Sequence, residues 1–166
     1  MNLSLEVPTV DVCVGGVSVS LRPLPLGFHR RLKERGVVPP VPKRTAARDS
    51  AGRVLRDADG RPVLTEDAAD AGHLAAVDRY QERLAALMLA ESLGGGVSFE
   101  TPPPGEAGDW NAYADRLLEE LSEAGVTPGD LAALCRGVCE ASRLIEPAVK
   151  AAGERLFPAA AEAATG

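Results

Sequence analysis

The stretch VDVCVGGVSVSLRPLPLGFHRRL, residues 10–32, decides the fold expected for this chain of 166 residues. On either side of Gly15 and Gly16, valines alternate with polar residues or cysteine. Such alternation is typical of a strand with one apolar face, and a Gly-Gly pair readily adopts the positive φ angles of a tight hairpin turn. The sequence therefore predicts an N-terminal β-hairpin. Because a lone hairpin is only marginally stable in water, it must pack on helices, pair with more strands or pair with another chain.

Two prolines end this hairpin and lead into a short helix. Pro23 and Pro25 interrupt strand pairing, and a helix is expected over residues 25–35. The apolar residues Leu24, Phe28 and Leu32 recur every four positions, so one stripe of this helix faces a core.

Amphipathic helices are predicted for most of the second half. Thr127 and Asp130 have the spacing of a capping box, and Pro128 between them suits the first position of a helix. Thr65 is a candidate cap for an early start of the longest helix, and Pro147 interrupts the last one. The expected helices cover residues 73–93 and 110–124, and a further helix begins at Pro128 and kinks or breaks near residues 143–146, before a last stretch at 147–157.

These elements predict a mainly α protein with a small N-terminal β-hairpin, which belongs to the α+β class. We expect a compact helical bundle of about four to five helices with a long basic Pro/Arg loop, in a single domain. Its expected parts are the hairpin and short helix (1–36), a flexible basic loop (37–64), the helical body (65–158) and a disordered tail (159–166). A turn signal at residues 57–60 is compatible with a second small hairpin, and we detect no internal repeat.

Charge is unevenly distributed along the chain, whose net charge is −6. Residues 22–61 carry 11 basic and 4 acidic residues, whereas residues 62–166 carry 7 basic and 18 acidic ones. The basic loop is a candidate partner surface; equally, it folds back on the acidic body or stays solvated. Nucleic-acid binding is disfavoured by the acidic balance and by the absence of aromatic residues between Phe28 and Tyr80.

No combination of residues indicates catalysis. Cys135 and Cys139 share a helix face and are interpreted as core residues, since the two histidines lie in distant segments and no CxxC pair exists. The glycines at 94–96 lack the Lys-Ser or Lys-Thr of a phosphate-binding loop. We therefore expect no enzyme, no cofactor and no metal site.

The sequence also predicts a compartment. No apolar run approaches the roughly 18 residues that cross a bilayer, so no membrane association is expected. The first nine residues have no basic start of the kind that opens a secretory signal, and the three cysteines do not form a disulfide framework. We expect a cytoplasmic protein.

One phrase resembles a known family. The run Val19-Ser20-Leu21-Arg22-Pro23-Leu24-Pro25-Leu26, placed after a strand pair and before a helix, is similar to the start of tail assembly chaperones of long-tailed phages and prophages. The stretch ADRLLEELSEAGVTPGDLAALC, residues 114–135, resembles these proteins in style. The resemblance implies a non-catalytic protein of the bacterial host cytoplasm that coats the hydrophobic tape measure protein and helps to recruit tail tube subunits.

A chaperone of this kind needs an apolar groove between helices that covers a helical stripe of its partner. The candidate partner-binding residues are Leu84, Leu87, Met88, Leu117, Leu121, Leu134 and Val138, with Arg44, Arg48 and Arg53 of the basic loop. The alternative for the apolar residues is that they form the protein's own core. Two other functions remain open, a structural subunit of a phage-like particle (a tail or connector component) and a small protein-binding adaptor, and self-association is possible with any of them.

Overall fold

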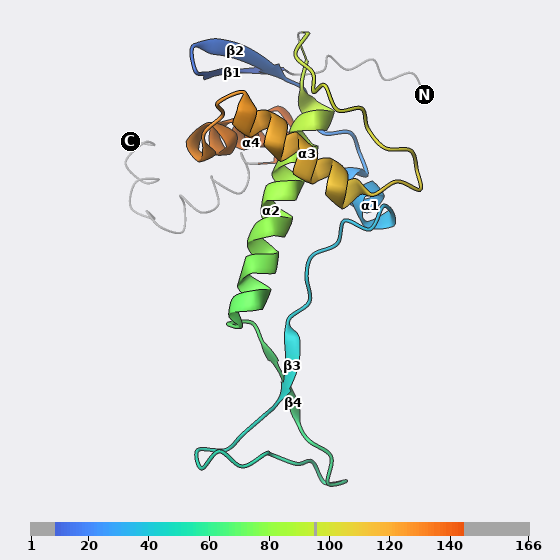
Figure 1. Ribbon diagram of the computed structural model, residues 1–166, viewed down its shortest axis with the longest axis vertical. Coiled ribbons are helices and arrows are strands. Elements are labelled where there is room, and N and C mark those ends of the chain that lie inside the picture. Colours follow the sequence, from blue (N-terminus) through green and yellow to red (C-terminus); the bar gives the residue numbers. More distant parts are fainter. Residues whose placement is uncertain (1–8, 95, 145–166) are drawn as a thin grey trace, which may run out of the picture.

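The computed structural model describes residues 9–94 and 96–144, which form a helical body and a projecting arm (Figure 1). This arrangement confirms a mainly α fold with an N-terminal β-hairpin, of the α+β class. The body contains β1 (Val10–Val14), β2 (Val17–Leu21), α1 (Phe28–Glu34), α2 (Ala71–Ser92), α3 (Trp110–Glu123) and α4 (Pro128–Ala141). The arm contains β3 (Lys43–Ala46) and β4 (Leu64–Asp67) with residues 47–63 between them. The helix expected at 147–157 and the tail at 159–166 lie outside the described residues.

The N-terminal hairpin has the register that its alternation predicts. Val12 pairs with Val19 and Val10 pairs with Leu21 in antiparallel strands. Gly15 and Gly16 have φ angles of 57° and 81°, so the turn depends on residues that tolerate the left-handed region.

Side-chain caps define where the helices begin. The Thr127 hydroxyl accepts the N–H of Asp130, and the Asp130 side chain accepts the N–H of Thr127, which confirms the capping box. The prediction that Thr65 caps an early start of α2 is wrong. Thr65 lies in β4, and the Asp70 carboxylate caps α2 by accepting the N–H of His73 at 2.9 Å.

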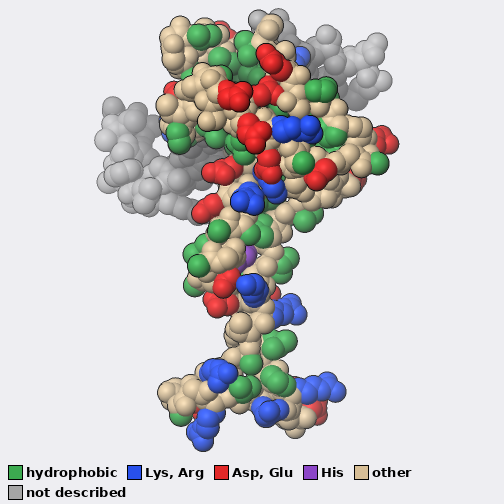
Figure 2. Space-filling model, in the orientation of Figure 1, with side chains coloured by type: hydrophobic (Ala, Val, Ile, Leu, Met, Phe, Trp, Pro, Cys, Tyr) green, Lys and Arg blue, Asp and Glu red, His purple; other side chains and the backbone are tan. Residues whose placement is uncertain are grey.

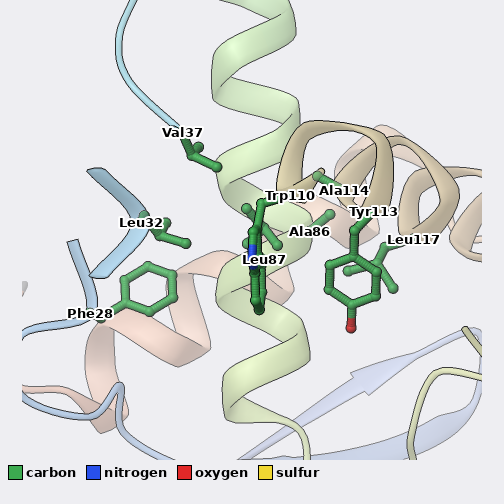
Figure 3. Packing of buried hydrophobic residues seen from close by; sticks show 9 residues of the cluster. All are labelled: Phe28, Leu32, Val37, Ala86, Leu87, Trp110, Tyr113, Ala114 and Leu117. Atoms are coloured by element: carbon green, nitrogen blue, oxygen red, sulfur yellow. The ribbon is translucent and has the colours of Figure 1, made fainter. Parts of the chain in front are cut away.

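The larger core cluster joins α1, α2 and α3 (Figure 3). The Arg83 guanidinium holds α2 and α3 together at its edge with two hydrogen bonds of 2.6 Å to the Asp115 carboxylate. The Arg35 guanidinium lies 3.8 Å from the centre of the Trp110 ring, a cation–π contact that ties the end of α1 to α3. The buried members of the cluster are Phe28, Leu32, Val37, Ala86, Leu87, Trp110, Tyr113, Ala114 and Leu117.

A second cluster joins the hairpin to α2 and α4 through Leu21, Leu89, Leu134 and Val138. The hairpin lies directly against α4 at Gly137. A Cβ atom at this position would lie 2.5 Å from Val12 Cγ2 and 2.8 Å from Leu21 Cδ1. The helix therefore needs a residue without a side chain here, although glycine is a poor helix former.

The end of β2 is also hydrogen-bonded to the C-terminal end of α2. The N–H of Arg22 donates to the Ser92 carbonyl at 2.7 Å, and the N–H of Gly94 donates to the Ser20 carbonyl at 3.0 Å. The Arg22 guanidinium donates to the Leu93 carbonyl at 2.8 Å, where a cation is favoured by the helix dipole. We call these three bonds the β2–α2 junction.

We expect Gly137→Ala to lower the stability of the protein. Alanine would favour the helix by about 1 kcal/mol, but the added methyl group overpacks the contact with Val12 and the fully buried Leu21, which costs about 1–3 kcal/mol. Gly129→Ala is the matched control in the same helix, because the nearest atom to its Cβ is 3.7 Å away. Denaturant unfolding should show a net loss for Gly137→Ala and no loss for Gly129→Ala; equal stability of the two variants would contradict the close contact.

Candidate functional site

An open, mostly apolar groove of about 550 Å³ lies between the hairpin and the helices of the body. Its walls come from the hairpin, the C-terminal end of α2, residues 97–100 and the turn between α3 and α4. Val17 and Val97 on these walls are 59% and 43% exposed, values that leave apolar surface for a partner. The apolar lining consists of Val14, Val17, Val19, Leu89, Leu93, Val97, Phe99, Leu121, Ala124, Val126 and Leu134.

The charged side chains that line this groove are all carboxylates: Glu100, Glu120, Glu123 and Asp130. Asp130 is engaged in capping α4, whereas Glu100 and Glu123 are exposed. We call this surface the acid-rimmed groove. Its potential favours an apolar ligand flanked by positive charge and disfavours one flanked by negative charge.

Glu120 fastens one wall of the groove. Its carboxylate accepts the N–H groups of Glu100 and Thr101, each at 2.8 Å. Hydrogen bonding from the Thr101 side chain, assisted by these two N–H groups and opposed by partial desolvation, lowers the pKa of Glu120 from its ordinary value of 4.5. The ionised Glu120 carboxylate thus holds the connection between α2 and α3 against the helical body.

The arm is built on an internal repeat that the sequence analysis missed. RDSAGRVL, residues 48–55, is followed by RDADGRPVL, residues 56–64. In each copy the aspartate carboxylate accepts the N–H groups two and four positions later at 2.8–3.0 Å. The preceding arginine donates to the glycine carbonyl, at 2.7 Å in the first copy and 2.6 Å in the second. Asp, Gly and Arg recurring at a spacing of eight was the signal that could have identified the repeat.

Three backbone hydrogen bonds close the tip of the arm into a ring. The N–H of Ala47 donates to Val63, that of Val63 to Leu55, and that of Leu55 to Ala47, at 2.8–2.9 Å. The β3–β4 ribbon and the two repeat turns meet at this ring, so the tip is held by hydrogen bonds in place of an apolar core. We call residues 47–63 the arm tip.

The arm is less basic than the linear charge count predicts. Residues 43–67 contain six basic and five acidic residues. Arg44 of β3 faces Glu66 of β4 at 3.6 Å, and Lys43 lies 3.7 Å from Asp70. The acidic residues counted with the helical body thus neutralise part of the arm. The expectation that the basic loop folds back on the acidic body is wrong, because the arm projects away from the body (Figure 1).

The predicted partner-binding residues are divided among the buried core, its half-buried edge, the groove and the arm. Leu87, Leu117 and Val138 are buried in the core, which corresponds to the alternative that these apolar residues form the protein's own core. Leu84 and Met88 are half-buried against the core clusters. Leu121 and Leu134 line the acid-rimmed groove. Arg44, Arg48 and Arg53 are all exposed on the arm, remote from the groove.

The two cysteines of α4 lie at the edge of the core and are not among the members of either core cluster. Cys135 and Cys139 are half-buried on α4, and burial raises the pKa of both thiols, which disfavours the reactive thiolate. Within residues 9–94 and 96–144, no three or more His, Cys, Asp or Glu side chains are grouped in a way that could hold a metal ion.

Comparisons with protein-family models, curated proteins and solved structures find no match to this chain. Among the described helices, none is both long enough and apolar enough to cross a membrane.

The amide signals of Glu100 and Thr101 should report the ionisation of Glu120. Because the pKa of Glu120 is lowered, the hydrogen bonds from the Glu100 and Thr101 amides to its carboxylate are fully formed above pH 4.5. They are lost as the pH falls through the lowered pKa. An NMR titration from about pH 7 to about pH 2 should therefore give a midpoint below the ordinary glutamate pKa for both amides. Glu120→Gln should abolish the transition and Glu119→Gln should leave it unchanged. A midpoint at or above 4.5 would contradict the attachment.

Proposed function

We propose that this protein is a non-catalytic assembly chaperone that holds the apolar face of a partner helix in the acid-rimmed groove. The observation that carries the proposal is the groove itself: exposed aliphatic side chains on its walls and only carboxylates among its charged lining residues. An amphipathic helix with basic residues beside its apolar stripe has the complementary chemistry.

The resemblance of residues 19–26 to tail assembly chaperones of long-tailed phages and prophages supports a particular partner. A tape measure protein is a long helical chain whose apolar stripes would aggregate if left uncovered. We propose that it is the client, that tail tube subunits are recruited in the same assembly, and that the protein acts in the bacterial host cytoplasm. In this structure Leu21, Arg22 and Leu24 of that phrase build the β2–α2 junction and the adjoining core, so they support the groove and do not touch the partner.

A designed peptide tests the groove. The probe is a labelled helix of about 20 residues with leucines at positions i, i+3, i+4 and i+7 and lysines beside them, and a second peptide carries glutamates in place of the lysines. Fluorescence anisotropy should show binding of the lysine peptide that is about tenfold tighter or more, equivalent to about 1.4 kcal/mol. Val17→Asp in the groove should weaken binding. The control Val41→Asp, at a valine that is 79% exposed outside the groove, should not.

Binding of both peptides with equal affinity would show that the acidic rim has no role. Equal binding by Val17→Asp and Val41→Asp would place the contact elsewhere and remove the basis of the proposal. Circular dichroism of the two variants separates loss of binding from loss of fold.

Co-expression tests the client. We expect a long coiled-coil protein to be encoded beside this chain. It should remain soluble when the two are produced together and should precipitate when this chain carries Val17→Asp. A client that stays insoluble with the unaltered chain would contradict the chaperone proposal.

The projecting arm favours a second candidate, a structural subunit of a phage-like particle. Ordered arms that leave the body of a small protein can interlock neighbouring subunits. A structural subunit remains in the finished particle and an assembly chaperone leaves it, so mass spectrometry of purified particles distinguishes the two.

A further inference from the structure

We propose that the arm tip of a second copy of this chain occupies the acid-rimmed groove until a client displaces it. Copies would then associate head to tail through one repeated contact. The displacement by a client rests on the proposed function, whereas the contact between copies does not.

The arm tip carries apolar side chains that nothing in the described part of the chain covers. β3 and β4 pack on each other, and nearly all their residues are exposed. Leu55 and Val63 of the ring are 45% and 38% exposed, and Leu64 beside them is 57% exposed. Because the hydrogen-bonded ring already orders this apolar patch, less conformational entropy is lost when a partner binds it.

The charge of the arm tip complements the groove. The carboxylates of Asp49 and Asp57 accept backbone N–H groups, Arg53 forms an ion pair with Asp49 at 3.0 Å, and Asp59 is the third acidic side chain of the tip. The tip contains four arginines, namely Arg48, Arg53, Arg56 and Arg61, and three aspartates, so its net charge of +1 is opposite in sign to the four carboxylates that line the groove. Figure 2 shows basic side chains at the margins of the tip and acidic side chains gathered over the body. Lysine and arginine beside apolar residues also characterise the client proposed for the groove.

The tip cannot reach the groove of its own chain. The groove is formed at the C-terminal end of α2, at Leu89 and Leu93, whereas the arm joins the body before its N-terminal end at Ala71. The 22 residues of α2 place these ends about 33 Å apart, with a continuous helix between them. The occupant is therefore a second copy. Because tip and groove are different surfaces, the contact is heterologous and gives open chains or closed rings.

Two variants that complement each other test this arrangement. Leu55→Asp removes the apolar centre of the tip and leaves the groove, and Val17→Asp alters the groove and leaves the tip. Sedimentation velocity should show larger species of the unaltered chain with rising concentration, and each variant alone should be monomeric. An equimolar mixture of the two should form a dimer and nothing larger, because one tip and one groove remain usable. Val41→Asp should behave like the unaltered chain.

Salt provides a second measurement. Raising sodium chloride from about 0.1 M to about 1 M shortens the screening length from about 10 Å to about 3 Å and should weaken the association. Adding the lysine-flanked peptide should dissociate the assemblies into monomers.

Three results would overturn the proposal: a monomeric unaltered chain at about 1 mM, assemblies that persist in Leu55→Asp, or a mixture of folded variants that stays monomeric. The experiment also separates this proposal from the chaperone proposal. Peptide binding without self-association would overturn only the contact between copies. If Val17→Asp blocks self-association but the peptide does not dissociate the assemblies, only the proposal that a client displaces the tip would be overturned.

Discussion

The β2–α2 junction is the constraint on which the other features depend. Two backbone hydrogen bonds and the Arg22 guanidinium hold the end of β2 against the last turn of α2. This contact places a marginally stable hairpin over the second core cluster, where Gly137 admits it to van der Waals contact with α4. One wall of the acid-rimmed groove is the hairpin itself, so the junction and the packing on α4 together form the groove.

Helix α2 organises the molecule along its length. Its buried residues, Ala86, Leu87, Leu89 and Ser92, all lie in its C-terminal third, where the two core clusters meet. Its N-terminal part carries the arm away from the body (Figure 1). Packing thus stabilises the C-terminal end of α2, which forms part of the groove. The length of the same helix keeps the arm remote from the groove. The acid-rimmed groove and the arm tip therefore lie at opposite ends of this helix, which is the arrangement that the proposed contact between copies requires.

The arm shows how order arises without an apolar core. Each repeat copy satisfies its backbone groups through an aspartate carboxylate, an arginine and a glycine with φ near 78°. The ring of Ala47, Leu55 and Val63 then joins the two turns to the ribbon. Hydrogen bonds of this kind contribute only about 1 kcal/mol each, but they rigidify a short segment and leave its apolar side chains on the surface.

Local patterns determined the elements of this protein. Alternation with Gly-Gly specified the hairpin, the capping box specified the start of α4, and the apolar stripes specified the helices, because each depends on neighbours in the sequence. The tertiary structure alone decided which leucines lie in the core and which line the groove. Leu87 and Leu117 have the same spacing as groove residues but are covered from several sides, and Val17, Leu93 and Val97 form one surface only after distant segments meet. The tertiary structure also decided that acidic residues neutralise part of the positive charge of the arm. The acidic partners of Lys43 and Arg44 follow them by more than 20 residues in the sequence. They reach these side chains only through the pairing of β3 with β4 and through the cap of α2.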